Sequence, residues 1–274
     1  MLFDGECRVL LCRGCALVFL GGSRRDLDDY YSRLYDPGLE DRPVTHERVV
    51  RWVLPHLPAN GDRRLLEVGC GHGHLLVRLR ERGFRVSGIE PSERAAEHAR
   101  NVYGLTVACS TLERLVGPLA GERHDAVLMI QTLEHLADPL AALSVVRGLM
   151  VSDALLFVEV PHFFSPTGIY CAGLNGRYVP SGNHLFVYSA ETLTAFMIRA
   201  GFDVVHRART LTDLRIVARP SARARPAASL PPLAAAAYWQ ARAFHALTPL
   251  LLRALDVAKG ARRMVHLVRR GKDA

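Results

Sequence analysis

Three glycines at alternate positions follow an apolar run in the stretch LLEVGCGHGHLL. They are Gly69, Gly71 and Gly73. The residues before them, Arg64 to Gly69, predict a buried strand, and the residues after them, His74 to Arg82, predict a helix. A glycine turn at such a junction lets the backbone come close to a ligand. This unit therefore favours an α/β fold with a ligand-binding loop.

Strand and helix patterns alternate along the rest of the chain as far as residue 218. Alternation of this kind predicts a mostly parallel sheet with helices on both faces. The last two strands have no full helix between them, which predicts an antiparallel hairpin at one edge. The predicted strands are 64–69, 84–89, 105–109, 125–130, 154–160, 202–208 and 214–218, and the predicted helices are 46–57, 74–82, 93–102, 139–150 and 190–200. Ser92 is expected to cap the helix over 93–102.

Two acidic residues flank the glycine turn. Glu90 lies about twenty residues downstream, at the end of the next predicted strand, where a carboxylate can accept hydrogen bonds from ribose hydroxyls. Glu67 lies two residues before Gly69, where it would repel a pyrophosphate but suit a cationic ligand. S-adenosylmethionine (SAM) carries an ammonium and a sulfonium and no phosphate. Each acid also has an alternative explanation. Glu90 could be an ordinary exposed loop carboxylate, and Glu67 could be a buried acid at a strand end that pairs with another residue of the protein.

Several segments together resemble the class I SAM-dependent methyltransferases over about residues 45–218. The resemblance implies an α/β, Rossmann-like, seven-stranded sheet of order 3-2-1-4-5-7-6, with strand 7 antiparallel and helices on both faces. The segments that carry it are LLEVGCGHGHLL, GIEPS, HDAVLMIQTLEHLADPLAALSVVRGLM, LLFVEVP and SAETLTAFMIRAGFDVV.

The resemblance also implies which residues bind SAM and, after the reaction, S-adenosyl-L-homocysteine (SAH). They would hold the methionine end, the ribose and the adenine in turn. For the methionine end these are Glu67, Gly69, Gly71, Gly73 and Gln131, for the ribose Glu90 with Pro91 and Ser92, and for the adenine Thr111 and Leu112.

A histidine is the commonest general base for deprotonating a hydroxyl or carbon acid. His184, in SGNHLFVYS, resembles the histidine of a Glu-His-x-x-Tyr-x-Ser stretch in sugar C-methyltransferases, although Asn183 replaces the glutamate. His135 follows Glu134 and is the second catalytic candidate, with organisation of the loop as its alternative.

Three further histidines lie close to the predicted site. His162 follows Pro161 and is expected at the rim of the cleft. His72 and His74 stand in the glycine loop, where the family commonly has small or polar residues, and we expect them to face solvent.

The first 22 residues are rich in cysteine and resemble the second half of a zinc ribbon. Only one Cys-x-x-Cys knuckle is present, Cys12 to Cys15, and the spacing of Cys7 does not match a first knuckle. A structural zinc site needs four ligands. We therefore predict a degenerate ribbon over 1–22 and no metal, followed by a methyltransferase domain over 23–218.

The positive charge of the chain is confined to its C-terminal part. The net charge is +8 overall, but residues 219–274 hold eleven Lys/Arg and two acids while residues 1–218 are nearly neutral. Nucleic acid is therefore not expected as a partner of the main domain. We predict a linker over 219–232 and a basic helical extension over 233–274, which would contact a membrane surface or a protein partner.

These features predict an enzyme that transfers a methyl group from SAM to a small molecule, a metabolite hydroxyl or a sugar nucleotide. The loop 163–182 is expected to form a lid that selects the acceptor. The opening residues lack a signal-peptide pattern, so a cytoplasmic protein is expected. The alternatives are a non-catalytic SAM-binding or scaffold protein and an NAD-dependent dehydrogenase.

Overall fold

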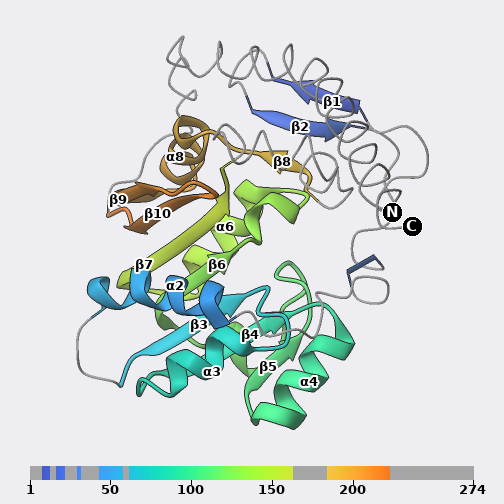
Figure 1. Cartoon of the computed structure of the whole chain (residues 1–274), viewed down its shortest axis with the longest axis vertical. Coiled ribbons are helices and arrows are strands. Elements are labelled where there is room, and N and C mark those ends of the chain that lie inside the picture. The colour runs from blue at the N-terminus through green and yellow to red at the C-terminus, as the bar shows by residue number, and fades with distance from the viewer. Residues whose placement is uncertain are drawn as a thin grey trace, which may run out of the picture.

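The computed structural model describes residues 8–12, 17–21, 30–31, 43–57, 62–162 and 184–222 of the chain. Its main feature is a seven-stranded sheet of order β5-β4-β3-β6-β7-β10-β9 (Figure 1). Counted along the chain from β3, this is the predicted order 3-2-1-4-5-7-6. The strands are β3 (Arg64–Val68), β4 (Arg85–Glu90), β5 (Thr106–Cys109), β6 (His124–Ile130), β7 (Met150–Pro161), β9 (Phe202–Arg209) and β10 (Asp213–Pro220).

The pairing directions also match the prediction. β3 pairs in parallel with both β4 and β6, and β6 pairs in parallel with β7. β10 runs antiparallel to β7 and to β9, so the hairpin formed by the last two strands closes one edge of the sheet. The seven-stranded Rossmann-like fold is therefore confirmed.

Helices cover both faces of the sheet. Ser92 caps α4 as predicted, because its Oγ accepts a hydrogen bond from the backbone N–H of Ala95 at 3.4 Å. Asp138 caps α6 in the same way. The described helices are α2 (Pro43–Val53), α3 (His74–Arg80), α4 (Glu93–Tyr103), α5 (Pro118–Gly121), α6 (Pro139–Gly148) and α8 (Ala190–Arg199), with short 3-10 turns at η2 (Leu54–His56) and η3 (Leu133–His135).

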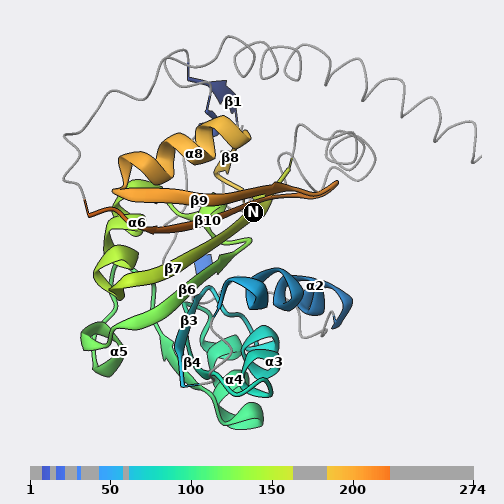
Figure 2. The same cartoon turned by 90° about the vertical axis from the view of Figure 1, so that its left-hand side faces the viewer.

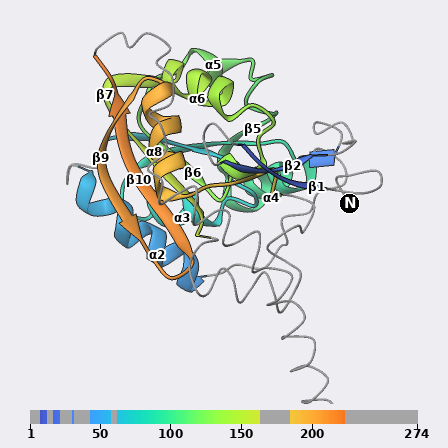
Figure 3. The ribbon, with the colours of Figure 1, turned by 90° about the horizontal axis from the view of Figure 1, so that it is seen from above.

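Alternate residues of the central strands build two apolar layers. Leu128 and Phe157 face α2 and α3, whereas Met129 and Val158 face α6 and α8. The views in Figures 2 and 3 show α2 and α8 on opposite sides of the β9–β10 ribbon. Because the strands are buried on both faces, they read in the sequence as nearly continuous apolar runs.

Two strand boundaries differ from the prediction by more than one residue. β7 begins at Met150, four residues earlier than expected, because Met150 pairs with His124 of β6. β10 continues through Pro220, which pairs with Phe202, so the predicted linker from residue 219 begins inside a strand. In both places a neighbouring strand extends a segment whose own composition does not favour a strand.

A small second sheet joins the N-terminal hairpin to the strand before α8. β1 (Arg8–Leu11) and β2 (Val18–Gly21) form an antiparallel hairpin, and β2 pairs with β8 (Phe186–Val187). Leu17 is buried in the apolar layer that contains α6 and α8. The hairpin includes Cys12, while Cys7 and Cys15 lie outside the described residues, so the zinc-ribbon remnant stays a prediction.

The predicted lid and the basic extension also lie outside the described residues, which leave out 163–183 and everything after 222. None of the helices that the structure describes combines the length and apolar character needed to cross a membrane.

Gly73 and Gly104 allow a matched test of packing at the glycine loop. Both have a positive φ, +83° and +61°, but a Cβ on Gly73 would lie 2.5 Å from Leu105 Cδ1, whereas a Cβ on Gly104 would meet nothing within 4 Å. We expect Gly104→Ala to cost about 1 kcal/mol through backbone strain and Gly73→Ala to cost about 1–3 kcal/mol more through overpacking. Urea denaturation followed by circular dichroism measures both, and equal losses would contradict this packing.

Candidate active site

The carboxyl ends of β3, β4 and β6 meet at one edge of the sheet and surround a pocket of about 340 Å³. This is where open α/β sheets bind ligands. Among the described residues, the pocket is lined by Tyr31, Val68, Gly69, Gly71, Ile89, Glu90, Pro91, Ser110, Thr111, Leu112, Glu113, Gln131, Thr132, His135, Leu136, Ala137 and Asp138.

The glycine loop forms one wall of this pocket. Gly69, Gly71 and Gly73 all have a positive φ, which other residues adopt only with strain. A Cβ on Gly69 would lie 2.7 Å from Thr132 Oγ1, so the loop can approach the end of β6 only without a side chain. Gly69 and Gly71 line the pocket. Gly73, at the start of α3, packs against Leu105 instead.

Glu90 closes the pocket at the end of β4. Its carboxylate accepts hydrogen bonds from the backbone N–H of Gly71 at 2.7 Å and of Ser92 at 2.9 Å. The side chain is only 4% exposed, and burial raises its pKa against the lowering effect of these two bonds. Pro91 follows in the pocket lining, and Ser92 is buried behind it as the cap of α4.

Glu67 lies behind the glycine loop and carries an orphaned oxygen. The residue is buried, and its Oε2 has no hydrogen-bond partner in the described structure. Burial, and then the nearby charge of Glu90, hold the pKa of Glu67 well above its usual range. A buried carboxylate of this kind lacks the cation or donor that would stabilise its charge. Glu67 is not in the described lining of the pocket, although its neighbours Val68 and Gly69 are.

The predicted adenine residues lie across the pocket from the glycine loop. Thr111 and Leu112 follow β5 and both line the pocket. Leu112 is buried and contributes an apolar surface, while Thr111 Oγ1 is buried without a hydrogen-bond partner among the described residues. An apolar contact with one unsatisfied hydroxyl suits a flat heterocycle with polar edges.

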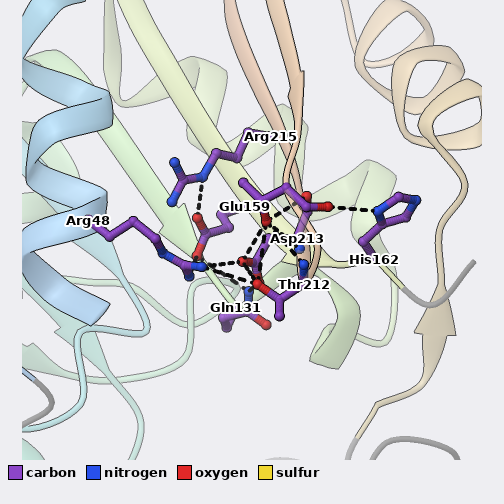
Figure 4. A network of polar contacts seen from close by, with 8 residues as sticks. Arg48, Gln131, Glu159, His162, Thr212, Asp213 and Arg215 are labelled. Atoms are coloured by element: carbon purple, nitrogen blue, oxygen red, sulfur yellow. Dashed lines mark hydrogen bonds and ion pairs between the residues drawn. The ribbon is translucent and has the colours of Figure 1, made fainter. Parts of the chain in front are cut away.

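Gln131 ends β6 with a φ of +54°, and it is the one described residue other than glycine with a positive φ. A polar network holds it there (Figure 4). Its Nε2 donates to Asp213 at 3.0 Å, and its backbone N–H donates to the Glu159 carbonyl at 2.8 Å. Arg48 of α2 pairs with Asp213 at 2.9 Å, and Arg215 pairs with Glu159. These ion pairs, in which Arg48 is partly exposed and the other members are buried, were not predicted from the sequence and offset the strain at Gln131.

The two catalytic candidates are neighbours. The rings of His135 and His184 lie 4.8 Å apart in an edge-to-face contact, and Tyr31 shares a hydrogen bond of 3.1 Å with Nδ1 of His135. His135 lines the pocket, and His184 is not in its described lining. The backbone N–H of Leu185 donates to the Glu134 carbonyl at 2.8 Å and ties the two segments together.

Glu134 lies beside both histidines and was not predicted as a site residue. It is fully buried, and neither carboxylate oxygen has a hydrogen-bond partner in the described structure. Burial raises its pKa to about 8. One ligand atom each from Glu134, His135 and His184 lies within 4.8 Å of the others. Two imidazoles and a carboxylate can transfer a proton, and the same groups are common zinc ligands. The expectation of no metal remains untested.

The other three histidines lie outside the pocket lining. His162 stands at the end of β7, where its backbone N–H donates to the Thr212 carbonyl and its Nδ1 lies 3.1 Å from the Thr210 carbonyl oxygen (Figure 4). The prediction that His72 and His74 face solvent is wrong. His72 is 3% exposed and His74 is half-buried, because both pack against His98 of α4.

Comparison with known proteins agrees with this geometry. Residues 39–207 match the model of a family described as a methyltransferase domain. The chain is 34% identical over 163 residues to a ubiquinone biosynthesis O-methyltransferase of Cereibacter sphaeroides, which covers 55% of this chain and 64% of that protein. It is 33% identical over 177 residues to the enzyme of the same name from Haemophilus ducreyi, covering 58% and 75%. The chain thus spans slightly less than two thirds of the Cereibacter relative.

Solved structures show the same fold. A SAM-dependent methyltransferase from Thermotoga maritima is 26% identical with a TM-score of 0.51, covering 65% of this chain and 89% of that one. One from Mesorhizobium loti is 19% identical with a TM-score of 0.51, covering 62% and 96%. With the family match over more than half of its length, the chain belongs to the class I SAM-dependent methyltransferases.

Proposed function

We propose that this chain transfers the methyl group of SAM to a small-molecule acceptor, a metabolite hydroxyl or a sugar nucleotide. The names of the relatives, ubiquinone biosynthesis O-methyltransferases, favour an oxygen atom as the acceptor. The resemblance of the His184 segment to sugar C-methyltransferases supports a sugar nucleotide instead.

The charge of the pocket carries the assignment of the cofactor. Its described lining contains three carboxylates, Glu90, Glu113 and Asp138, and neither lysine nor arginine. The orphaned oxygen of Glu67 adds a fourth acid behind the loop. Such a site repels a pyrophosphate and attracts an ammonium and a sulfonium. This disfavours a dinucleotide such as NAD and favours SAM.

Each predicted residue has a separate part in the proposed reaction. When bound, SAM supplies an electrophilic methyl group on sulfur. Glu90 would accept hydrogen bonds from the ribose diol, and Thr111 and Leu112 would hold the adenine. His135 lines the pocket and would take the acceptor proton, with His184 and Glu134 behind it to receive or balance the charge. Alignment of acceptor and methyl donor would supply much of the rate enhancement.

The alternative of a non-catalytic SAM-binding protein is disfavoured by the histidine pair. A protein that only binds SAM has no need for two imidazoles and a buried acid at the acceptor side of the pocket.

We also propose that the basic C-terminal extension contacts an anionic membrane surface or a partner, on the basis of its charge and apolar residues.

Calorimetric titration with SAH and with NAD tests the cofactor. We expect SAH to bind and NAD not to bind. Glu90→Gln should weaken SAH binding by about ten- to a hundredfold, because the carboxylate is a stronger acceptor than a neutral amide. The control is Glu81→Gln, which replaces an exposed residue at the end of α3 and should leave SAH affinity unchanged. Binding of NAD without SAH would overturn the assignment.

Turnover tests the histidine pair. The full chain is incubated with methyl-labelled SAM and a metabolite extract, and labelled products are quantified. His135→Ala should lower product formation by about a hundredfold or more, the usual share of a general base, and His184→Ala should lower it by a smaller factor, each with SAH affinity within about twofold of wild type. His206→Ala on exposed β9 is the control. Undiminished product formation in His184→Ala would remove this residue from the mechanism.

Glu134 gives the stability of the protein a predictable pH dependence. Its pKa is about 8 in the folded state and near 4.5 when unfolded, so the folded state holds the extra proton. Stability contributed by this residue is present below pH 4.5 and is lost as the pH rises toward 8. The free energy of unfolding of Glu134→Gln should therefore rise relative to that of the wild type between pH 5 and pH 8, by on the order of a few kcal/mol.

Urea denaturation of both proteins at several pH values measures this difference. A variant that becomes less stable than wild type at high pH would show instead that ionised Glu134 is held by a cation. Repeating the titration with a chelator would then separate a metal ion from protonated His135 or His184.

A further inference from the structure

A second hollow, of about 850 Å³, lies against α2. Of its charged lining residues, four are arginines and one is an acid, Glu47. Glu47 already accepts two hydrogen bonds from Arg82, at 2.8 and 2.9 Å. The hollow, which we call the arginine pocket, is lined in the described structure by Pro43, Val44, Glu47, Arg48, Arg51, Trp52, Arg78 and Arg215.

Unsatisfied N–H groups gather at the base of the arginine pocket. Trp52 is 9% exposed, and its only polar atom, Nε1, has no hydrogen-bond partner in the part of the chain that the structure describes. Arg215 is 7% exposed, with its guanidinium 4.8 Å from the Trp52 ring centroid, and its Nη2 also lacks a partner there, as does Nε of Arg48. Buried donors are seldom left unpaired, so three of them around one hollow indicate a missing acceptor.

The arginines are held in place from the opposite side. Glu159 pairs with Nε of Arg215, and Asp213 pairs with Nη1 of Arg48 at 2.9 Å. Figure 4 shows the Nη atoms of Arg215 on the side of the guanidinium that faces α2, away from Glu159. The carboxylates of the sheet therefore fix both guanidinium groups and leave the Nη atoms of Arg215 directed toward α2.

We propose that the arginine pocket binds the phosphate group of a ligand. A phosphate presents three terminal oxygens and up to two negative charges, and guanidinium groups match its geometry. A carboxylate has two oxygens and one charge, too few for the donors of Arg48, Trp52 and Arg215 together with the exposed Arg51. The site would serve a phosphorylated small molecule or the phosphate monoester headgroup of a lipid such as phosphatidate, which present the same chemistry.

The position of the arginine pocket connects it with the cofactor pocket. Asp213 pairs with Arg48 on one side and accepts a hydrogen bond from Gln131 on the other, and Gln131 lines the cofactor pocket. Arg48, Asp213 and Gln131 thus form a wall between the two pockets. The two pockets are therefore connected through Asp213, and the phosphate site does not depend on the proposed methyl transfer.

Calorimetric titration of the full chain with inorganic pyrophosphate, without cofactor, tests the site. We expect one binding event that the double variant Arg51→Gln, Arg78→Gln weakens at least about tenfold. Arg85→Gln with Arg123→Gln removes the same charge from exposed positions outside the arginine pocket and should leave the affinity within about twofold. No binding by wild type up to about 10 mM, or equal weakening by both double variants, would overturn the proposal. SAH titration of the same samples reports separately on the proposed function.

Sedimentation with vesicles distinguishes the two sources of phosphate. Vesicles of phosphatidylcholine with and without phosphatidate are mixed with wild type and both double variants. Phosphatidate-dependent binding that pyrophosphate displaces and only the Arg51→Gln, Arg78→Gln variant loses would assign the site to a lipid headgroup. Pyrophosphate binding combined with equal vesicle binding by all three proteins would assign it to a soluble phosphorylated ligand. Either result supports the phosphate site.

Discussion

The parallel pairing of β3 with both β4 and β6 is the constraint on which the site depends. In this register Glu67 lies opposite Gly88 on one side and Leu128 on the other. The strands therefore end at the same edge of the sheet, where Gly69, Glu90 and Gln131 are brought around one pocket. A shift of this pairing would separate the glycine loop from Glu90 and Gln131. The apolar side chains on the two faces of the sheet hold the register, because a slip would expose them.

The buried charges fix the shape of the site rather than stabilise the fold. Glu159, Asp213 and Arg215 are each nine-tenths or more buried, and desolvation opposes each of them. In return, the network fixes Gln131 in a conformation that it would not adopt alone and directs guanidinium donors toward α2. Such arrangements, costly to assemble and rigid once formed, are typical of functional sites.

Prediction from the sequence succeeded where the chemistry is local. The glycine turn, the cap at Ser92 and the acid at Glu90 each depend on residues close together along the chain, and the structure has each of these local arrangements. It was incomplete where distant segments meet. Nothing in the sequence brings Glu134 next to His184, and the burial of His72 depends on α4, more than twenty residues away. A histidine in a loop is predicted to be exposed, and only the tertiary structure shows that α4 covers His72.

By itself, the sequence determined the order of strands and helices, the family and the position of the glycine loop, because periodicity, capping and glycine conformation act over a few residues. Only the tertiary structure decided which charged groups are buried and which of them meet. Glu67 is buried with one oxygen unpaired in the described structure, Glu134 lies beside two histidines, and Arg48 of α2 and Arg215 of β10 pair with acids of the sheet. The energy of a charge depends on the dielectric and the neighbours around it, and folding sets both.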